Sequence, residues 1–426
     1  MPLLAKVPPK TALVIGAGIS GLAAARTLKD ASWDVLVLEA RNRIGGRIDT
    51  VRSLGEVLER GANWIHGTDD NPLMHLAREA GAVPVETDYE DVLAFGPDGA
   101  LLSNDVLEKA ETRYDTLLKR IDARVDKSED RPLLSALRSE MPQFLADPLL
   151  CALGADTESD TGGRLEDLSA YYFDEDDVFD GPDVILGGGY DRICDLLARD
   201  VAIKLNETVL RIQHGSNHAT VETNAGTYQA DHVICTVPLG VLKTGAIRID
   251  PPLPVRQARA IDRIGFGHMA KLALTFDAVA WPEDPHFFFH ASATRGRWPS
   301  IFNLRAVTGQ NTLMLICAGE AALKADELSD AAIVTDAMTT LRRLFGPRLA
   351  EPTGFMRSTW SKDPFARGVY SFVAVGSTPS DFDVLAQSSG PALRLAGEHT
   401  TSRYRGTVHG AYLSGLQAAN GLLDQP

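Results

Sequence analysis

Three glycines near the start of the chain have a spacing that can bring backbone amides against a phosphate group. Gly16, Gly18 and Gly21 follow the apolar run of residues 11–15, and the Ala-rich residues 22–29 come next. In a strand–turn–helix unit, the first glycine permits the tight turn and the second lets the backbone approach a pyrophosphate. The third lets the helix pack close to the strand. The amides at the start of the helix, with the positive end of its dipole, then bind phosphate oxygens.

An acidic residue at the end of the next apolar run fits the same unit. Residues 34–38 have the character of a second buried strand, and Glu39 follows them directly, 23 positions after Gly16. A carboxylate there can accept hydrogen bonds from the hydroxyl groups of a ribose. Together with Ser20 inside the glycine turn, these residues predict a dinucleotide-binding unit. The alternative is a Gly-rich turn in a plain α/β domain.

The residues after Glu39 distinguish between two dinucleotides. The stretch E-A-R-x-R-x-G-G-R contains Arg41, Gly46 and Arg47, and a nicotinamide site does not need this cluster. The pattern resembles flavoproteins of the amine oxidase superfamily. The resemblance implies that Arg41 and Arg47 lie by the phosphates and ribose of FAD, whereas Arg43 is interpreted as a solvated surface charge.

Two further stretches carry side chains that could do chemistry. GANWIHG, residues 61–67, is too short and too Gly-rich for a helix, and its His66 either closes a turn or faces a substrate. The half-apolar strand AKLALTF contains Lys271, for which a surface lysine with a snorkelling ammonium is the simplest interpretation.

The elements that must position these residues follow from local patterns. We expect residues 72–150 to be mostly helical, with an apolar stripe that packs into a core. Strands return from Val201 onwards, and a second region of helices and strands spans 255–350. The C-terminal residues again read as a strand followed by a helix. The members of the apolar stripe are Leu107, Ala110, Tyr114, Leu117, Leu118 and Ile121.

The resemblance extends over nearly the whole chain and narrows to polyamine oxidases and flavin-dependent lysine-specific histone demethylases. It rests on GANWIHGTDDNP, CTVPLGVLK, IGFGHMAKLALTFDAVAWP, TWSKDPFARGVYSFVAVG and AGEHTTSRYRGTVHGAYLSGLQAA, in family order. It implies an α/β fold in which a Rossmann-like FAD-binding domain interleaves with an α+β substrate-binding domain. The expected FAD-binding domain comprises 1–75, 181–267 and 380–426, and the substrate-binding domain comprises 76–180 and 268–379.

The same resemblance implies roles for single residues around FAD. Glu398 would bind the ribityl or phosphate region, and Thr407 and Val408 would contact the flavin and ribityl group. Val209 would place its backbone by the adenine. Trp360 would pack by the isoalloxazine, although its residue type alone favours a core aromatic. The loop along the flavin edge would comprise Gly61, Ala62, Asn63 and Trp64.

Three residues would carry the reaction if the resemblance holds. Lys271 would hold a water at flavin N5, and Tyr370 would form part of the aromatic wall over the ring. His66 would approach the substrate amine. From residue type alone, Tyr370 is a core aromatic.

Composition sets limits on partners. The chain has 426 residues, 44% of them hydrophobic, and a formal net charge of -15, so two domains are expected and nucleic acid is not. The acidity fits a cationic ligand but also ordinary solubility. The run Asp174–Asp177 is either a funnel for cations or a solvated loop, and the second is favoured.

The four cysteines show neither zinc spacing nor a disulfide framework, so no metal is expected. The last one, Cys317, lies well before the C-terminal motif, which predicts non-covalent FAD. No apolar stretch approaches the roughly 18 residues that span a bilayer, and the first ten residues do not read as a signal peptide. We expect a cytoplasmic protein without membrane contact, as a monomer or weak homodimer.

The predicted activity is FAD-dependent oxidation of spermine, spermidine or their acetylated forms. The carbon next to an amine would lose a hydride to flavin N5. The resulting imine would be hydrolysed to an aldehyde and an amine, and oxygen would become hydrogen peroxide. The alternatives are a flavin oxidase or dehydrogenase of another amine, either a monoamine or an amino acid, and a non-catalytic interaction module stabilised by FAD.

Overall fold

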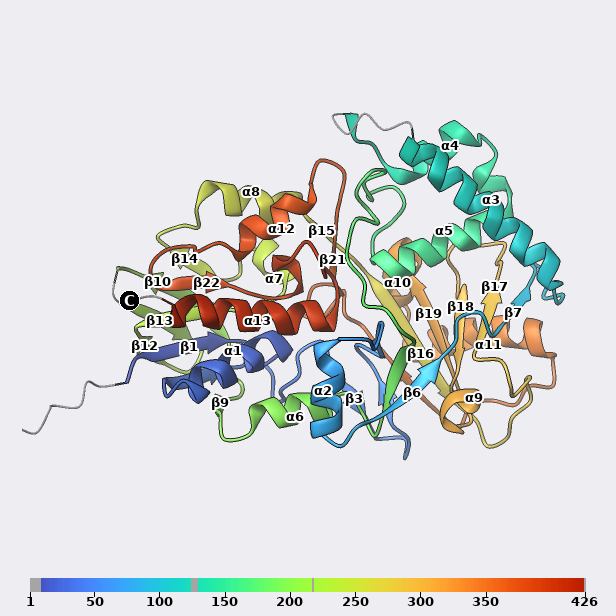
Figure 1. Ribbon diagram of the computed structural model, residues 1–426. Helices are drawn as coiled ribbons and strands as arrows, with labels where there is room; N and C mark the ends of the chain where they lie inside the picture. The colour runs from blue at the N-terminus through green and yellow to red at the C-terminus, as the bar shows by residue number, and fades with distance from the viewer. Residues whose placement is uncertain (1–8, 124–128, 217, 425–426) are drawn as a thin grey trace, which may run out of the picture. The chain divides into compact units, whose positions relative to one another are not determined.

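The computed structural model describes residues 9–123, 129–216 and 218–424, and it divides into two compact units (Figure 1). Unit 1 consists of Met1–Arg47, Ile193–Asp262 and Ser380–Pro426, and unit 2 consists of Ile48–Arg192 and Arg263–Pro379. Both units mix helices and strands, as expected. Residues 48–75 and 181–192, which we expected in the FAD-binding domain, group with unit 2. The assignment of cofactor and substrate to separate domains remains a prediction.

Unit 1 is built on a parallel five-stranded sheet with the order β22-β13-β1-β2-β9. The expected strands at residues 11–15 and 34–38 are confirmed with the same bounds. The strands are β1 (Thr11–Ile15), β2 (Asp34–Leu38), β9 (Ala202–Lys204), β13 (His232–Cys235) and β22 (Leu393–Leu395). A second sheet, β12-β11-β10-β14, consists of β10 (Val209–His214), β11 (Ala219–Thr223), β12 (Thr227–Ala230) and β14 (Arg248–Asp250).

Two helices of unit 1, one near each end of the chain, pack against each other. In Figure 1, α13 lies along α1, and their contact is close because a Cβ on Gly415 would fall 2.1 Å from the Ser20 carbonyl oxygen. The Ser20 and Ser414 hydroxyls are 3.2 Å apart at the same place. The helical segments are α1 (Ile19–Asp30), α6 (Asp191–Ala198), α7 (Leu239–Lys243), α8 (Val255–Arg263), α12 (Pro379–Ala386), η3 (Glu398–Thr400) and α13 (Val408–Leu423).

Unit 2 contains a six-stranded sheet with the order β20-β16-β19-β18-β17-β7 and a three-stranded sheet, β5-β8-β6. Two small pairs, β3 with β4 and β15 with β21, complete its strands. The bounds of the larger sheets are β5 (Trp64–Ile65), β6 (Val83–Thr87), β7 (Val92–Phe95), β8 (Asp183–Gly187), β16 (Met269–Thr275), β17 (Phe287–His290), β18 (Ser300–Asn303), β19 (Thr312–Ala318) and β20 (Gly354–Arg357). Those of the small pairs are β3 (Thr50–Val51), β4 (Leu58–Glu59), β15 (Gly265–Phe266) and β21 (Ser371–Phe372).

The longer helices of unit 2 form two groups, and a few short segments lie outside them. One group packs on the six-stranded sheet through a buried cluster and consists of α10 (Gly319–Glu327) and α11 (Asp330–Phe345). The other, seen together in Figure 1, consists of α3 (Asn104–Ala123), α4 (Leu133–Glu140) and α5 (Pro148–Thr161). The remaining segments are α2 (Pro72–Glu79), η2 (Phe144–Ala146) and α9 (Leu304–Thr308). None of the helices in the described residues is long and apolar enough to cross a membrane.

The segment 72–150 is mostly helical, as expected, and the apolar stripe is core. Ala110, Tyr114, Leu117 and Ile121 form the buried face of α3. The segment also holds two strands that local patterns did not reveal, β6 and β7. Strand β7 pairs with β17, with Val92 opposite Phe287, so its partner lies almost two hundred residues away in the chain.

Candidate functional site

The glycine turn of unit 1 has the geometry that its spacing predicts. The Gly16 amide donates to the Leu38 carbonyl at 2.8 Å and joins the ends of β1 and β2. A Cβ on Gly21 would lie 2.0 Å from the Gly16 carbonyl oxygen, so this position requires glycine for the close approach of α1 to the turn. A Cβ on Gly18 would meet no protein atom closer than 3.9 Å. Its nearest neighbours would be the Gly45 carbonyl oxygen at 3.9 Å and the Gly46 Cα at 4.0 Å, which are ordinary van der Waals contacts.

The start of α1 is suited to an anion. Its N-cap, Gly18, makes no side-chain cap, and the first turn holds no acidic residue. The amides and the positive end of the dipole are thus not neutralised by the helix itself. Glu39 is buried at the end of β2, where it accepts from the Ala17 amide at 2.7 Å and from the Arg41 amide at 2.8 Å. Each carboxylate oxygen keeps a second lone pair with which it can accept from a ribose hydroxyl.

The arginine cluster reaches the C-terminal motif inside unit 1. The guanidinium of Arg47 donates to the buried Glu398 carboxylate at 2.8 Å, which neutralises that charge. The other Glu398 oxygen accepts from the Gly406 amide at 3.2 Å. Gly46 passes close to the glycine turn, because a Cβ on it would lie 3.2 Å from the Gly18 Cα.

The remaining predicted contacts of unit 1 lie at element ends. Thr407 is the N-cap of α13, and its hydroxyl accepts from the Gly410 amide at 2.9 Å and donates to the Tyr404 carbonyl. Val408 is the first residue of that helix. Val209 is buried at the start of β10. The two ends of the chain therefore belong to one unit. The Thr407 side chain caps the N-terminus of α13.

In unit 2, Lys271 is a buried residue of β16, only 6% exposed. Its ammonium donates to the Gly61 carbonyl and to the Asn63 side-chain oxygen. It also lies 5.8 Å from the centroid of the Trp64 ring. The interpretation of Lys271 as a snorkelling surface lysine is therefore wrong, and Lys271 holds the loop on which the predicted flavin contacts lie.

Burial gives Lys271 an unusual acidity. Desolvation lowers its pKa to about 7, against a smaller opposing effect of the Glu59 charge. Glu59 is also buried, and desolvation raises its pKa to about 7 despite hydrogen bonds from the Tyr190 amide and the Thr50 hydroxyl. Sequence reasoning missed Glu59. The signal that could have revealed it is an acid two positions before the glycine of GANW, at the end of a short apolar run.

Of the two predicted aromatic residues, Trp360 contacts the same loop and Tyr370 packs beside Trp360. The Trp360 indole donates to the Arg60 carbonyl at 3.1 Å, one residue before Gly61. Tyr370 packs partly buried against the cluster that contains Trp360, and its hydroxyl donates to the Ser159 carbonyl at the end of α5. Trp360, Lys271 and residues 60–64, with Ala62 among them, are thus brought together. Their contacts with flavin remain predictions.

His66 lies across from an aspartate on the neighbouring strand. In the antiparallel pair β5 and β8, Trp64 is opposite Ile185 and Ile65 is opposite Val184, so the next step brings His66 to Asp183. The His66 Nδ1 and Asp183 Oδ2 atoms are 2.6 Å apart. The His66 side chain is 52% exposed. It therefore does more than close a turn through its backbone neighbours, and Asp183 is a second polar group beside it.

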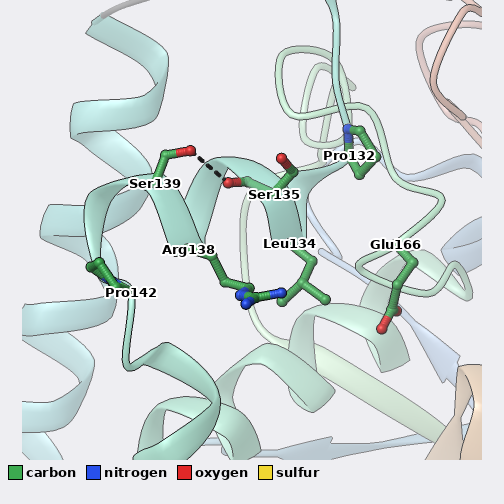
Figure 2. A pocket seen from close by; sticks show the side chains of 7 residues that line it. All are labelled: Pro132, Leu134, Ser135, Arg138, Ser139, Pro142 and Glu166. Carbon is green, nitrogen blue, oxygen red and sulfur yellow. Dashed lines mark hydrogen bonds between the residues drawn. The ribbon is translucent and has the colours of Figure 1, made fainter.

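A separate pocket of about 450 Å³ lies beside α4 in unit 2 (Figure 2). Its lining residues are Pro132, Leu134, Ser135, Arg138, Ser139, Pro142 and Glu166. None of the predicted site residues lines it, and its acidic member is already paired with Arg295 at 2.6 Å. This pocket is therefore not part of the candidate site.

Comparison with known proteins identifies the class. The sequence profile of the flavin-containing amine oxidoreductases matches residues 19–423. Lysine-specific histone demethylase 1 homolog 2 of Arabidopsis thaliana is 33% identical, over 96% of this chain and 58% of its own. Polyamine oxidase 4 of Oryza sativa subsp. japonica is 35% identical, over 97% of this chain and 88% of its own. A putrescine oxidase structure shares the fold, with a TM-score of 0.81, 23% identity and coverage of 98% and 100%.

The chain therefore belongs to the flavin-containing amine oxidoreductase family, and its cofactor is FAD. It spans little more than half the length of the demethylase relatives that it matches. The residues of unit 1 fit the cofactor, because the start of α1 has neither a side-chain cap nor an acidic residue in its first turn and can receive its phosphates. The expected superfamily and fold are confirmed.

Proposed function

We propose that this chain is an FAD-dependent polyamine oxidase that acts on spermine, spermidine or their acetylated forms. When bound, FAD would supply the acceptor for a hydride, which is two electrons and one proton, and oxygen would take these together with one proton from solvent to give hydrogen peroxide. The substrate nitrogen contributes its lone pair as the adjacent carbon loses hydride, which gives an iminium ion. Water then hydrolyses this ion to an aldehyde and a shorter amine.

The residues of unit 2 would prepare the substrate for this step. Only a neutral amine has the lone pair that the developing iminium needs, so an ammonium substrate must first lose a proton. The His66 imidazole has a ring nitrogen whose lone pair can accept that proton. Lys271 would hold the loop 61–64 and a water, and Tyr370 and Trp360 would orient the reacting carbon and exclude other water.

The observation that carries the choice of polyamines is the acidic surroundings of Tyr89 in unit 2. Desolvation raises the pKa of this phenol although the residue is 49% exposed, and the charges of Asp183, Asp160 and Asp156 raise it further. Three carboxyl groups therefore act on one side chain that itself lies 6.2 Å, between ring centroids, from Trp64. Desolvation raises the pKa of Asp156 to about 6 and that of Asp160 to about 8, so Asp183 and Asp156 carry most of the negative charge at neutral pH. A substrate with several ammonium groups complements such a field, whereas a monoamine uses only part of it.

A peroxide assay over a panel of amines tests the proposal. We expect kcat/KM at least ~10-fold higher for spermine, spermidine or an acetylated form than for putrescine, a monoamine or an amino acid, a difference of about 1.4 kcal/mol. Asp156→Asn should raise KM for polyamines and leave that of any weak monoamine substrate unchanged. Asp277→Asn, on an exposed aspartate two residues after β16, serves as the control. A monoamine preference would overturn the proposal.

The similarity to histone demethylases favours one second candidate, the oxidation of a methylated lysine side chain in a peptide. Such a substrate presents the same chemistry, a C–H bond next to an amine nitrogen. A dimethyl-lysine peptide therefore belongs in the panel. Peroxide and formaldehyde release from the peptide, with no turnover of free polyamines, would replace the first candidate with the second.

A further inference from the structure

We propose that Asp183 is a positioning residue that holds His66 in the tautomer whose Nε2 is unprotonated and able to take a proton from the substrate ammonium. The inference rests on the proposed function for the identity of the substrate. The pairing itself rests on geometry within unit 2 alone.

The strand register creates the pair. His66 follows β5 and Asp183 opens β8, directly opposite in the antiparallel ladder. One Asp183 oxygen lies 2.6 Å from His66 Nδ1, and the other accepts from the Gly67 amide at 2.8 Å. The two oxygens thus have different partners, so the carboxylate cannot rotate without the loss of one hydrogen bond.

The tautomer follows from the chemistry of the carboxylate. An ionised carboxylate can only accept, so Nδ1 must carry the hydrogen and Nε2 of the neutral ring keeps its lone pair. Asp183 is suited to this role because it stays ionised. Burial would raise its pKa, but the hydrogen bond from His66, the charge of that ring when it is protonated, and the Gly67 amide lower it below its ordinary value.

The surroundings keep the pair rigid on one side and accessible on the other. Asn71 donates to the carbonyls of His66 and Gly67 at 3.2 and 2.9 Å, and it is itself buried. The Asp183 side chain is 21% exposed and that of His66 52% exposed. The histidine ring therefore presents an accessible edge while its partner is held by the protein.

The pair also adjoins the group around Lys271. The Trp64 ring stacks on that of His66 with centroids 6.5 Å apart, and the Lys271 ammonium lies 5.8 Å from the Trp64 centroid. A single indole thus separates the lysine from the histidine. This places a proton acceptor beside the residues to which the oxidation is assigned.

Asp183→Asn tests the assignment through the tautomer. The asparagine carbonyl can keep the Gly67 amide, which turns its NH₂ group towards Nδ1. The ring must then accept at Nδ1 and carry its hydrogen on Nε2, where it can no longer take a proton. The tautomer is read from ¹⁵N chemical shifts of histidine-labelled holoenzyme at a pH where the ring is neutral. The His66 signal is identified by its loss in His66→Gln.

We expect the unprotonated nitrogen to move from Nε2 in the wild type to Nδ1 in Asp183→Asn. The rate of flavin reduction at saturating polyamine should fall at least ~10-fold with little change in KM and with full FAD content. The control is Glu79→Gln. It alters a surface histidine–carboxylate pair, His75 with Glu79, whose atoms are 3.9 Å apart, and should change neither readout.

Two results would overturn the assignment: a wild-type His66 protonated on Nε2, or an Asp183→Asn enzyme with wild-type flavin reduction. Failure of the proposed function is recognised separately. In that case the tautomer still inverts in Asp183→Asn, but no polyamine is oxidised by the wild type. A variant with reduced FAD content is replaced by Asp183→Ala, which removes the acceptor and should show the same loss of Nε2 as the unprotonated nitrogen.

Discussion

Lys271 has no aqueous surroundings to stabilise its charge. It is 6% exposed and held by the Gly61 carbonyl and the Asn63 side chain, while desolvation lowers its pKa to about 7. Near neutral pH it can therefore exist as either ammonium or amine. A lysine in this condition is a candidate for a role in proton or charge transfer, not only for a role in packing.

Replacement of Lys271 by methionine tests that role. Met keeps an apolar stem and removes the donor, so we expect FAD to stay bound while flavin reduction or reoxidation slows at least ~10-fold, about 1.4 kcal/mol of barrier. Stopped-flow measurement of each half-reaction checks it. Lys243→Met is the control, because Lys243 is an exposed lysine of unit 1 that donates to the Asp262 carbonyl. Unchanged rates in both half-reactions would reduce Lys271 to a structural residue.

The pH dependence of stability gives an independent reading of the same pKa. An unfolded Lys271 keeps its proton up to its ordinary pKa of 10.5, whereas the folded residue loses it near 7. Between these values the unfolded state binds more protons, so the contribution of Lys271 to stability rises with pH. We expect the Tm of the wild type, minus that of Lys271→Met, to increase from pH 7 to pH 10. A constant difference would show that the lysine is not perturbed.

At the scale of elements, the glycine turn of residues 16–21 joins β1 to α1 and is the predicted site of the cofactor phosphates. Two glycines of this turn differ in what a side chain would meet. A Cβ on Gly21 would clash with the Gly16 carbonyl oxygen at 2.0 Å, whereas a Cβ on Gly18 would make its nearest contact at an ordinary 3.9 Å. We expect Gly21→Ala to destabilise the apoprotein by more than about 2 kcal/mol. Gly18→Ala should keep apoprotein stability and weaken FAD binding at least ~10-fold. Thermal melts with and without FAD, with titration of flavin fluorescence, distinguish them. Equal apoprotein losses would contradict the interpretation.

In unit 2, the turn after β5 also contains a glycine at which a side chain would clash. Gly67 has a φ of +66°, and a Cβ on it would lie 2.0 Å from the Phe179 carbonyl oxygen. Gly55 has a φ of +79° with nothing within 4 Å, so it shares the backbone conformation without the clash. We expect Gly55→Ala to cost about 1 kcal/mol and Gly67→Ala clearly more, with loss of amine turnover. Chemical denaturation measures both. Equal costs would mean that the approach of Phe179 does not constrain the turn.

At the scale of the molecule, neither cysteine chemistry nor chain order favours a covalent flavin. All four cysteines are buried, and burial raises the pKa of Cys235 to about 11 and that of Cys317 above its ordinary value. A buried protonated thiol is a poor nucleophile. We expect a yellow protein whose FAD enters the supernatant after acid precipitation, as its absorption spectrum would show. Flavin that stays in the pellet would contradict the non-covalent assignment.

Local patterns in the sequence were sufficient for the first two strands of unit 1 and the turn between the first strand and its helix. Strands at 11–15 and 34–38 were predicted with the bounds that β1 and β2 have, because a short apolar run flanked by glycines and charges has few other solutions. The glycine spacing predicted the turn, and the apolar stripe of α3 predicted a core face. These features depend on residues within a few positions of one another.

Only the tertiary structure decided which side chains meet. Lys271 and Asn63 are 208 positions apart, and His66 and Asp183 are 117 apart. Their contacts arise from the register of β5 with β8 and from the depth at which β16 is buried, neither of which has a local signature. The same burial raises the pKa of Glu59 and lowers that of Lys271. Ionisation depends on what surrounds a group in space, so the sequence determined the candidates and packing determined their charge and their partners.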